Sequence, residues 1–180
     1  LAMITLPFVF SHHEFDTSAG EQQSVALQDN STVLLSAQTS IDTHFSATAR
    51  QIRMQSGEAF FHVSKDIARP FLVTTEWGEI RVVGTRFNVR AGLRQSLVVT
   101  VEDGVVEVSG AGAPQVYRLT AGQQLMIHTD GSIRQQQVQA DQIGAWRNQQ
   151  LVEDNWTIAE LLAELERYNP GVITLCNDSA

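Results

Sequence analysis

Cysteine and cationic residues are scarce in this 180-residue chain. Cys176 is the single cysteine, which excludes an internal disulfide framework and a zinc site built on several cysteines. Lys65 is the only lysine, and the formal net charge is −8. Because nucleic-acid binding relies on clustered cations that neutralise phosphates, this balance argues against DNA or RNA as a partner. The acidic balance mainly indicates a soluble domain.

A long hydrophobic run is also lacking. Residues 1–10 are almost wholly apolar, but as a helix they would reach only about 15 Å, half the thickness of a bilayer. No basic segment precedes them, so they are not a complete signal peptide. Two interpretations stay open, the stub of a transmembrane helix and a buried strand. We expect residues 1–14 to form a leader.

What is present, over residues 15–134, is a series of short alternating apolar and polar runs separated by turn residues. This pattern predicts a mainly β domain: an antiparallel roll or sandwich, or an irregular solenoid-like fold. Two Asp-Gly pairs, at 103–104 and 130–131, predict tight hairpin turns, because glycine tolerates positive φ. The adjacent Phe60 and Phe61 must point to opposite faces of their strand, and we expect a second layer to bury the outer one.

The pattern changes in the last quarter of the chain. Residues 135–150 resemble a connector, and residues 151–180 read as a strand, a helix and a strand. Thr157 and Glu160 have the spacing of a capping box, which starts a helix. We expect either the beginning of a small β-α-β subdomain that is cut short, or a helix that docks back onto the β domain. The apolar helix positions are Ile158, Leu161, Leu162 and Leu165, and the flanking strands are expected at 151–152 and 172–175.

A Gly-Thr pair interrupts the strand expected over residues 80–89. Glycine weakens strand pairing, so Gly84 needs a reason. One reason is structural, since Gly84 would permit close packing or a bulge beside Thr85, which is a good strand residue.

Other candidate sites are weaker. The histidines lack the spacing of zinc motifs, so we expect no metal and no cofactor. Acidic residues fall mainly in turns, so no glycan-cleaving pair of carboxylates is expected. An alternative is a secreted β-sandwich that binds carbohydrate or another ligand, although its usual aromatic platforms are reduced here to the isolated Trp77 and Tyr117. The helix glutamates are expected on its solvent face: Glu160, Glu164 and Glu166.

Several motifs in a fixed order resemble the periplasmic part of the FecR family, the single-pass regulators of iron-responsive sigma factors. The resemblance runs roughly from residue 18 to residue 175, and the helical segment is similar to the start of the short signalling domain of secretins and TonB-dependent receptors. The matching segments are residues 21–31, Gly57–Val63, Arg69–Val73, Gly84–Val89, Gly104–Val108, Leu119–Gln123 and Trp146-Arg147.

The resemblance implies a signal relay across the cell envelope. The partner would be the periplasmic signalling domain of a TonB-dependent siderophore receptor in the outer membrane. The domain would belong to a membrane-anchored protein of the inner membrane of a Gram-negative bacterium. Proteolysis of that protein would then release or activate an extracytoplasmic-function sigma factor, which binds through a cytoplasmic segment absent from this sequence.

The resemblance also gives two expectations about individual residues. Some members of the family are thought to cleave themselves at the matching Gly-Thr bond, which implies that the Thr85 hydroxyl attacks the Gly84 carbonyl. The matching C-terminal subdomain takes part in receptor docking, which makes the glutamates of the helix candidate partner contacts. They are Glu160, Glu164 and Glu166.

Overall fold

The computed structural model describes residues 11–92, 96–111, 115–152, 157–169 and 171. These residues form a mainly β domain with one α-helix, as predicted from the alternating pattern. The strands are β1 (Ser11–Asp16), β2 (Gln23–Ala26), β3 (Thr32–Leu35), β4 (Ser40–Phe45), β5 (Arg50–His62), β6 (Phe71–Thr74), β7 (Gly78–Val82), β8 (Arg86–Ala91), β9 (Ser96–Asp103), β10 (Val105–Gly110), β11 (Val116–Thr120), β12 (Gln123–His128) and β13 (Ile133–Gln137). The helical elements are the 3₁₀ helices η2 (Ala140–Gln142) and η3 (Ala145–Asn148) and the helix α1 (Ile158–Tyr168).

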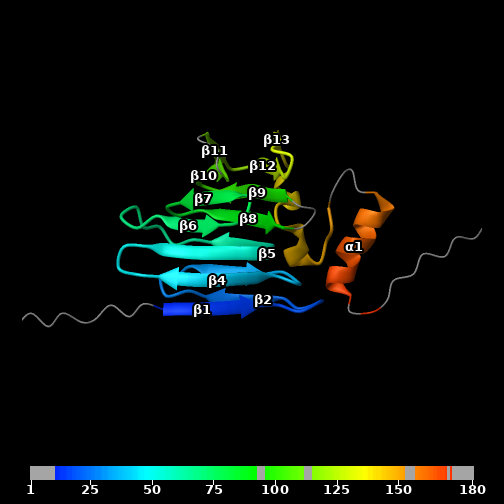
Figure 1. Cartoon of the computed structure of the whole chain (residues 1–180), viewed down its shortest axis with the longest axis horizontal. Helices are drawn as coiled ribbons and strands as arrows, with labels where there is room; N and C mark the ends of the chain where they lie inside the picture. Colours follow the sequence, from blue (N-terminus) through cyan, green and yellow to red (C-terminus); the bar gives the residue numbers. More distant parts are fainter. Residues whose placement is uncertain (1–10, 93–95, 112–114, 153–156, 170, 172–180) are drawn as a thin grey trace, which may run out of the picture.

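The strands make one curled sheet with two branches that share β5 (Figure 1). The first half of β5 pairs with β4 and, in parallel, with β6, and this branch continues through β7, β10 and β11. The second half pairs with β3 and β8, and that branch continues through β9, β12 and β13. β1 lies at one end of the stack, against β4. Gly57 lies inside the 13-residue β5.

The core lies between the two branches. Its largest fully buried aromatic side chains are Phe61, Phe71 and Phe87. The rings of Phe61 and Phe87, which are directly opposite on the paired strands β5 and β8, stack with centroids 5.0 Å apart on the core side of the sheet. Phe60 points to the other side of β5 and is buried beneath Ile143 and Trp146 of the 3₁₀ segment. The expectation that a second layer covers the outer phenylalanine is therefore confirmed.

Two expectations about strand connections are corrected and one is confirmed. Asp130-Gly131 turns the hairpin between β12 and β13, as predicted. Asp103-Gly104 does not, because β9 pairs with β8 and β12 whereas β10 pairs with β7 and β11. The glycine there has φ +90 and turns a corner from one branch to the other. Gly84-Thr85 lies between β7 and β8, at a second corner, rather than inside one strand.

The C-terminal elements also differ in part from expectation. The capping box of Thr157 and Glu160 starts α1, as predicted. Residues 151–152 form no strand, and the strand expected at 172–175 lies outside the described residues, as does the apolar segment 1–10. β1 begins within the expected leader and β13 extends into the expected connector. Among the described residues, no helix has the length and apolar character needed to cross a membrane.

Candidate functional site

The Gly84-Thr85 bond lies at the corner where the chain passes from β7 to β8, with Gly84 half-buried and Thr85 buried. The peptide groups on either side are held by the segment that follows β5. The Val63 amide donates to the Thr85 carbonyl at 2.9 Å, and the Asp66 amide donates to the Val83 carbonyl at 2.8 Å. The bond is therefore fixed by main-chain hydrogen bonds one residue before it and one residue after it.

Two glycines at this corner, Gly84 within it and Gly104 packed against it, have neighbouring atoms so close that a side chain would not fit. A Cβ at Gly84 would lie 2.8 Å from the Cα of Lys65, which a real side chain could not tolerate. A Cβ at Gly104 would lie 2.7 Å from the Thr85 Cγ2 and 3.1 Å from the Gly84 carbonyl oxygen. The two glycine motifs that the sequence analysis treated separately thus pack against each other. The pairing of β8 with β9 also shifts register at Arg86, which places a bulge beside the corner.

The Thr85 hydroxyl is the unusual group in this corner. The residue is 2% exposed, and its Oγ1 has no hydrogen-bond partner among the described residues. A buried hydroxyl without a partner costs about 1–3 kcal/mol, so such a group in a folded protein calls for an explanation. Packing accounts for the position of Gly84, but it does not account for a hydroxyl here in place of a methyl group. An uncommitted hydroxyl is the arrangement that nucleophilic attack on the preceding carbonyl would use.

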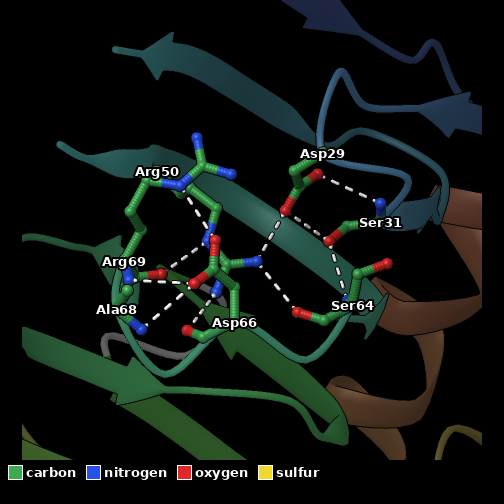
Figure 2. A network of polar contacts seen from close by, with 7 residues as sticks. All are labelled: Asp29, Ser31, Arg50, Ser64, Asp66, Ala68 and Arg69. Carbon is green, nitrogen blue, oxygen red and sulfur yellow. Dashed lines mark hydrogen bonds and ion pairs between the residues drawn. The ribbon is translucent and has the colours of Figure 1, made fainter. Parts of the chain in front are cut away.

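The segment that presses Lys65 against Gly84 is held by Arg50, whose side chain is 0% exposed (Figure 2). The guanidinium donates to the carbonyls of Ser64 (2.9 Å), Asp66 (3.2 Å) and Arg69 (2.7 Å). It also forms an ion pair with Asp29 at 2.8 Å. Sequence reasoning missed this network, because an arginine in an alternating strand is normally expected to face solvent.

A second set of contacts ties the 3₁₀ segment to the same corner. Glu102 forms ion pairs with Arg86 at 3.2 Å and with Arg147 at 2.8 Å. The Arg147 guanidinium also lies over the Phe60 ring, 3.6 Å from its centroid. This cation–π contact and the two ion pairs connect η3 with the start of β8.

Beneath η3, the second branch carries a polar cavity of about 90 Å³. Asn88 bridges its buried groups, since it donates to Glu58 at 2.7 Å and accepts from the Trp146 indole at 3.0 Å. Burial raises the pKa of Glu58 above its ordinary value, while Arg90 and the hydrogen bond from Asn88 oppose that rise. The cavity lining continues as a chain of amides and hydroxyls: Thr100, Gln124 and Gln136.

The glutamates expected on the solvent face of α1 have three different environments. Glu164 is buried and paired with Arg167, which also donates to the Ala37 carbonyl at 2.7 Å. Glu160 is partly buried and caps the helix through Thr157. Glu166 is exposed. The three carboxylates therefore do not form one exposed surface, and their role in partner binding stays a prediction.

The helix docks onto the β domain with its polar side. Tyr168 and Ser36 share a 2.9 Å hydrogen bond, and the Gly20 amide donates to the Arg167 carbonyl at 2.8 Å. Burial of this contact raises the pKa of Tyr168 to about 12. Ile158 and Leu161, expected on the buried face, are 67% and 39% exposed. Of the two arrangements considered for the helix, the described residues show docking onto the β domain.

Comparisons with known proteins agree with this architecture. Residues 13–107 match the family model described as FecR protein. Two crystal structures of a "putative anti-sigma factor" from Parabacteroides distasonis ATCC 8503 superpose with TM-scores of 0.82 and 0.80, each at 30% sequence identity. Both matches cover 89% of this chain, and they cover 76% and 80% of the respective neighbour. A search of curated proteins gives no match.

Proposed function

The chain belongs to the FecR protein family, and from that membership we propose that it is the signal-receiving domain of an anti-sigma regulator. In this proposal the domain binds the periplasmic signalling domain of a TonB-dependent siderophore receptor. It lies in the periplasm as part of a single-pass protein of the inner membrane. A cytoplasmic segment outside this sequence contacts the sigma factor.

One observation carries the regulatory part of this proposal. The structural neighbours are described as anti-sigma factors, and the likeness extends over nearly nine-tenths of this chain at 30% identity. The likeness therefore extends over more of the chain than residues 13–107, which the family model matches. The receptor, the siderophore and the membrane anchor come from the family resemblance and are the part that needs an experiment.

We place the receptor contact on the outer side of α1. Ile158 and Leu161 are exposed there, and exposed apolar side chains beside a charge are typical of interaction surfaces. Of the three helix glutamates, Glu166 is the one that is exposed. The inner side of the helix is occupied by the buried pair of Glu164 and Arg167, and Arg167 donates to the Ala37 carbonyl of the β domain.

The test is calorimetric titration of this domain with the isolated signalling domain of the receptor encoded beside its gene. We expect saturable one-to-one binding that Leu161→Arg weakens at least tenfold. Glu79→Arg, an exposed change on β7, is the matched control and should bind normally. If the unaltered domain binds no such receptor domain, the siderophore-receptor part is wrong. Binding that Leu161→Arg does not weaken would move the contact away from α1.

We propose in addition a single self-cleavage at the Gly84-Thr85 bond. The Thr85 hydroxyl attacks the Gly84 carbonyl carbon, the amide C–N bond breaks, and the hydroxyl proton passes to the nitrogen. Water then hydrolyses the resulting ester, which restores the hydroxyl and leaves a carboxylate on Gly84 and a free amino group on Thr85. The support is the buried Thr85 hydroxyl without a partner among the described residues, and the close packing of Gly84 against Lys65 and of Thr85 against Gly104.

Intact mass spectrometry of the purified domain tests this reaction. We expect two fragments that separate before Thr85, retained in Thr85→Ser and lost in Thr85→Val, which keeps the side-chain volume. Unfolding measurements on both variants show whether the fold persists. Cleavage that continues in a folded Thr85→Val domain would rule out this mechanism.

The alternative of a carbohydrate-binding module gains no support from the described residues. Trp77 and Tyr117 are both partly buried and pack against the main core, so neither forms an exposed platform for a sugar ring. We therefore do not pursue it as a second function.

A further inference from the structure

The pairing of β1 with β4 gathers metal-binding side chains from distant parts of the sequence. His12 lies directly opposite His44, and Glu14 lies directly opposite Asp42. Alternate residues of a strand share one face, and directly paired residues of neighbouring strands lie side by side. All four side chains are therefore neighbours on one face of this edge pair.

Three of these residues already bring their donor atoms together. One imidazole nitrogen of His12 and one carboxylate oxygen each from Glu14 and Asp42 lie within 4.8 Å of one another. Zinc bonds to nitrogen and oxygen ligands are about 2.0–2.2 Å long, so ligand atoms in a tetrahedral site lie about 3.4 Å apart. Side-chain rotation can bring the donor atoms from these separations to the spacing of a zinc site. Such rotation is open to these residues because His12 and Glu14 are exposed and Asp42 is partly exposed.

Neighbouring groups limit the orientations that two of the three ligands can take. The rings of His12 and His44 stack with centroids 4.4 Å apart, which restricts the orientation of His12. The Gln55 side-chain amide donates to Asp42 Oδ2 at 3.1 Å and leaves Asp42 Oδ1 available. Hydrogen bonds of this kind orient metal ligands in known sites.

The local charge also suits a cation. Glu14 and Asp42 contribute two negative charges, and Arg53, directly opposite Asp42 on β5, contributes one positive charge. The set keeps a net negative charge when the histidines are neutral. An imidazole nitrogen with two carboxylates is a donor set for zinc and similar first-row divalent ions.

We propose that this face of the β1–β4 pair binds a divalent transition-metal ion, with Zn²⁺ as the reference ion. His12, Glu14 and Asp42 are its ligands, and water completes the coordination. Two ligands come from β1 and one from β4, so the ion would clamp the edge strand to its neighbour. The sequence alone did not indicate this site, because its ligands become neighbours only through the strand register.

Calorimetric titration of the domain with Zn²⁺ tests the proposal. We expect one saturable site that His12→Ala and Asp42→Asn each weaken at least tenfold. His13→Ala is the matched control, because His13 lies on the opposite face of β1, with its ring 6.2 Å from that of Phe15. It should leave the affinity unchanged.

A second readout separates this site from adventitious surface binding. Zn²⁺ should raise the thermal unfolding midpoint of the unaltered domain and of His13→Ala, because a ligand that binds only the folded state stabilises it. That rise should vanish in His12→Ala, whose midpoint without zinc should match the unaltered domain. Absence of saturable binding up to about 1 mM Zn²⁺, the range of the weakest specific sites, would overturn the proposal. Equal affinity in His12→Ala, Asp42→Asn and His13→Ala would overturn it as well.

Discussion

The guanidinium of Arg50 and the carboxylate of Asp29 lie 2.8 Å apart, with side chains that are 0% and 3% exposed. This ion pair joins the turn between β2 and β3 to the start of β5, and the same guanidinium donates to carbonyls of the chain segment that follows β5. Asp29 in turn accepts from the Ser31 hydroxyl, which accepts from the Ser64 amide. The network therefore fixes the one parallel connection found among the described strands, from β5 to β6.

We predict that Arg50→Met destabilises the domain by about 3–5 kcal/mol, because removing one partner of a buried pair leaves the other charge uncompensated. Urea unfolding followed by tryptophan fluorescence measures the change. Arg69→Met is the control in the same segment, since its ion pair with Asp66 is partly exposed. An exposed pair contributes about 1 kcal/mol or less, so similar losses for both variants would contradict this account.

A second prediction concerns the corner glycine. Gly104→Ala should destabilise the domain by about 2–4 kcal/mol, because the new methyl group meets Thr85 and the backbone holds φ +90. Gly131→Ala has a similar φ of +80 but no atom within 4 Å of the new Cβ. That variant should lose only about 1–2 kcal/mol. The difference between their thermal unfolding midpoints isolates the packing of the corner, and equal midpoints would show that the close approach is unimportant.

Glu58 gives a prediction about pH. Burial raises the pKa of its carboxyl in the folded state above the ordinary value of 4.5. The folded protein then holds more protons than the unfolded chain, so stability falls as the pH rises from 4.5 through the folded-state pKa. Glu58→Gln can still accept from Asn88 and should remove this loss. Unfolding curves at several pH values measure the free energy of unfolding. The free energy of the variant should rise relative to that of the unaltered domain as the pH increases above 4.5, and this relative gain should disappear below pH 4.5. A constant difference across pH would contradict the assignment.

The docking of α1 provides a fourth prediction. Arg167→Gln should release the helix while the β domain stays folded, because Glu164 would lose its buried partner. Hydrogen exchange of the α1 amides should accelerate at least about tenfold, which corresponds to about 1.4 kcal/mol. Glu166→Gln, a change at an exposed position of the same helix, should leave exchange unaltered. Unchanged exchange in Arg167→Gln would show that this contact does not hold the helix.

The features predicted from sequence are those set by local chemistry. Alternation predicted the mainly β fold, and the capping box predicted where α1 begins. Asp-Gly predicted a positive φ at both 104 and 131, and both have it. Only the turn at Gly131 joins two strands that pair with each other. A tight turn does not specify whether the next strand pairs with the preceding strand or crosses to the other branch of the sheet, as it does at Gly104.

What could not be predicted depends on tertiary contacts. Gly57 lies within β5, and it allows the chain at Thr39 to approach so closely that a Cβ at Gly57 would lie 2.4 Å from the Thr39 Cα. Arg50 and Glu164 would both be expected to face solvent, and both are buried. Arg50 is buried because Asp29, distant in the sequence, balances its charge. Glu164 is buried because it pairs with Arg167, which also donates to the Ala37 carbonyl. The uncommitted hydroxyl of Thr85 is visible only once its neighbours are known.

The attachment of α1 to the start of the domain has a mechanical consequence. Tension applied to the chain beyond Tyr168 would be borne first by a few hydrogen bonds to Gly20, Ser36 and Ala37, rather than by a ladder between strands. Bonds that are few and local rupture sequentially, whereas the thirteen-residue β5 is held on both sides along its length. A pulled molecule should therefore yield its helix at low force and keep the curled sheet intact, which makes α1 a compliant link and the sheet a stiff anchor.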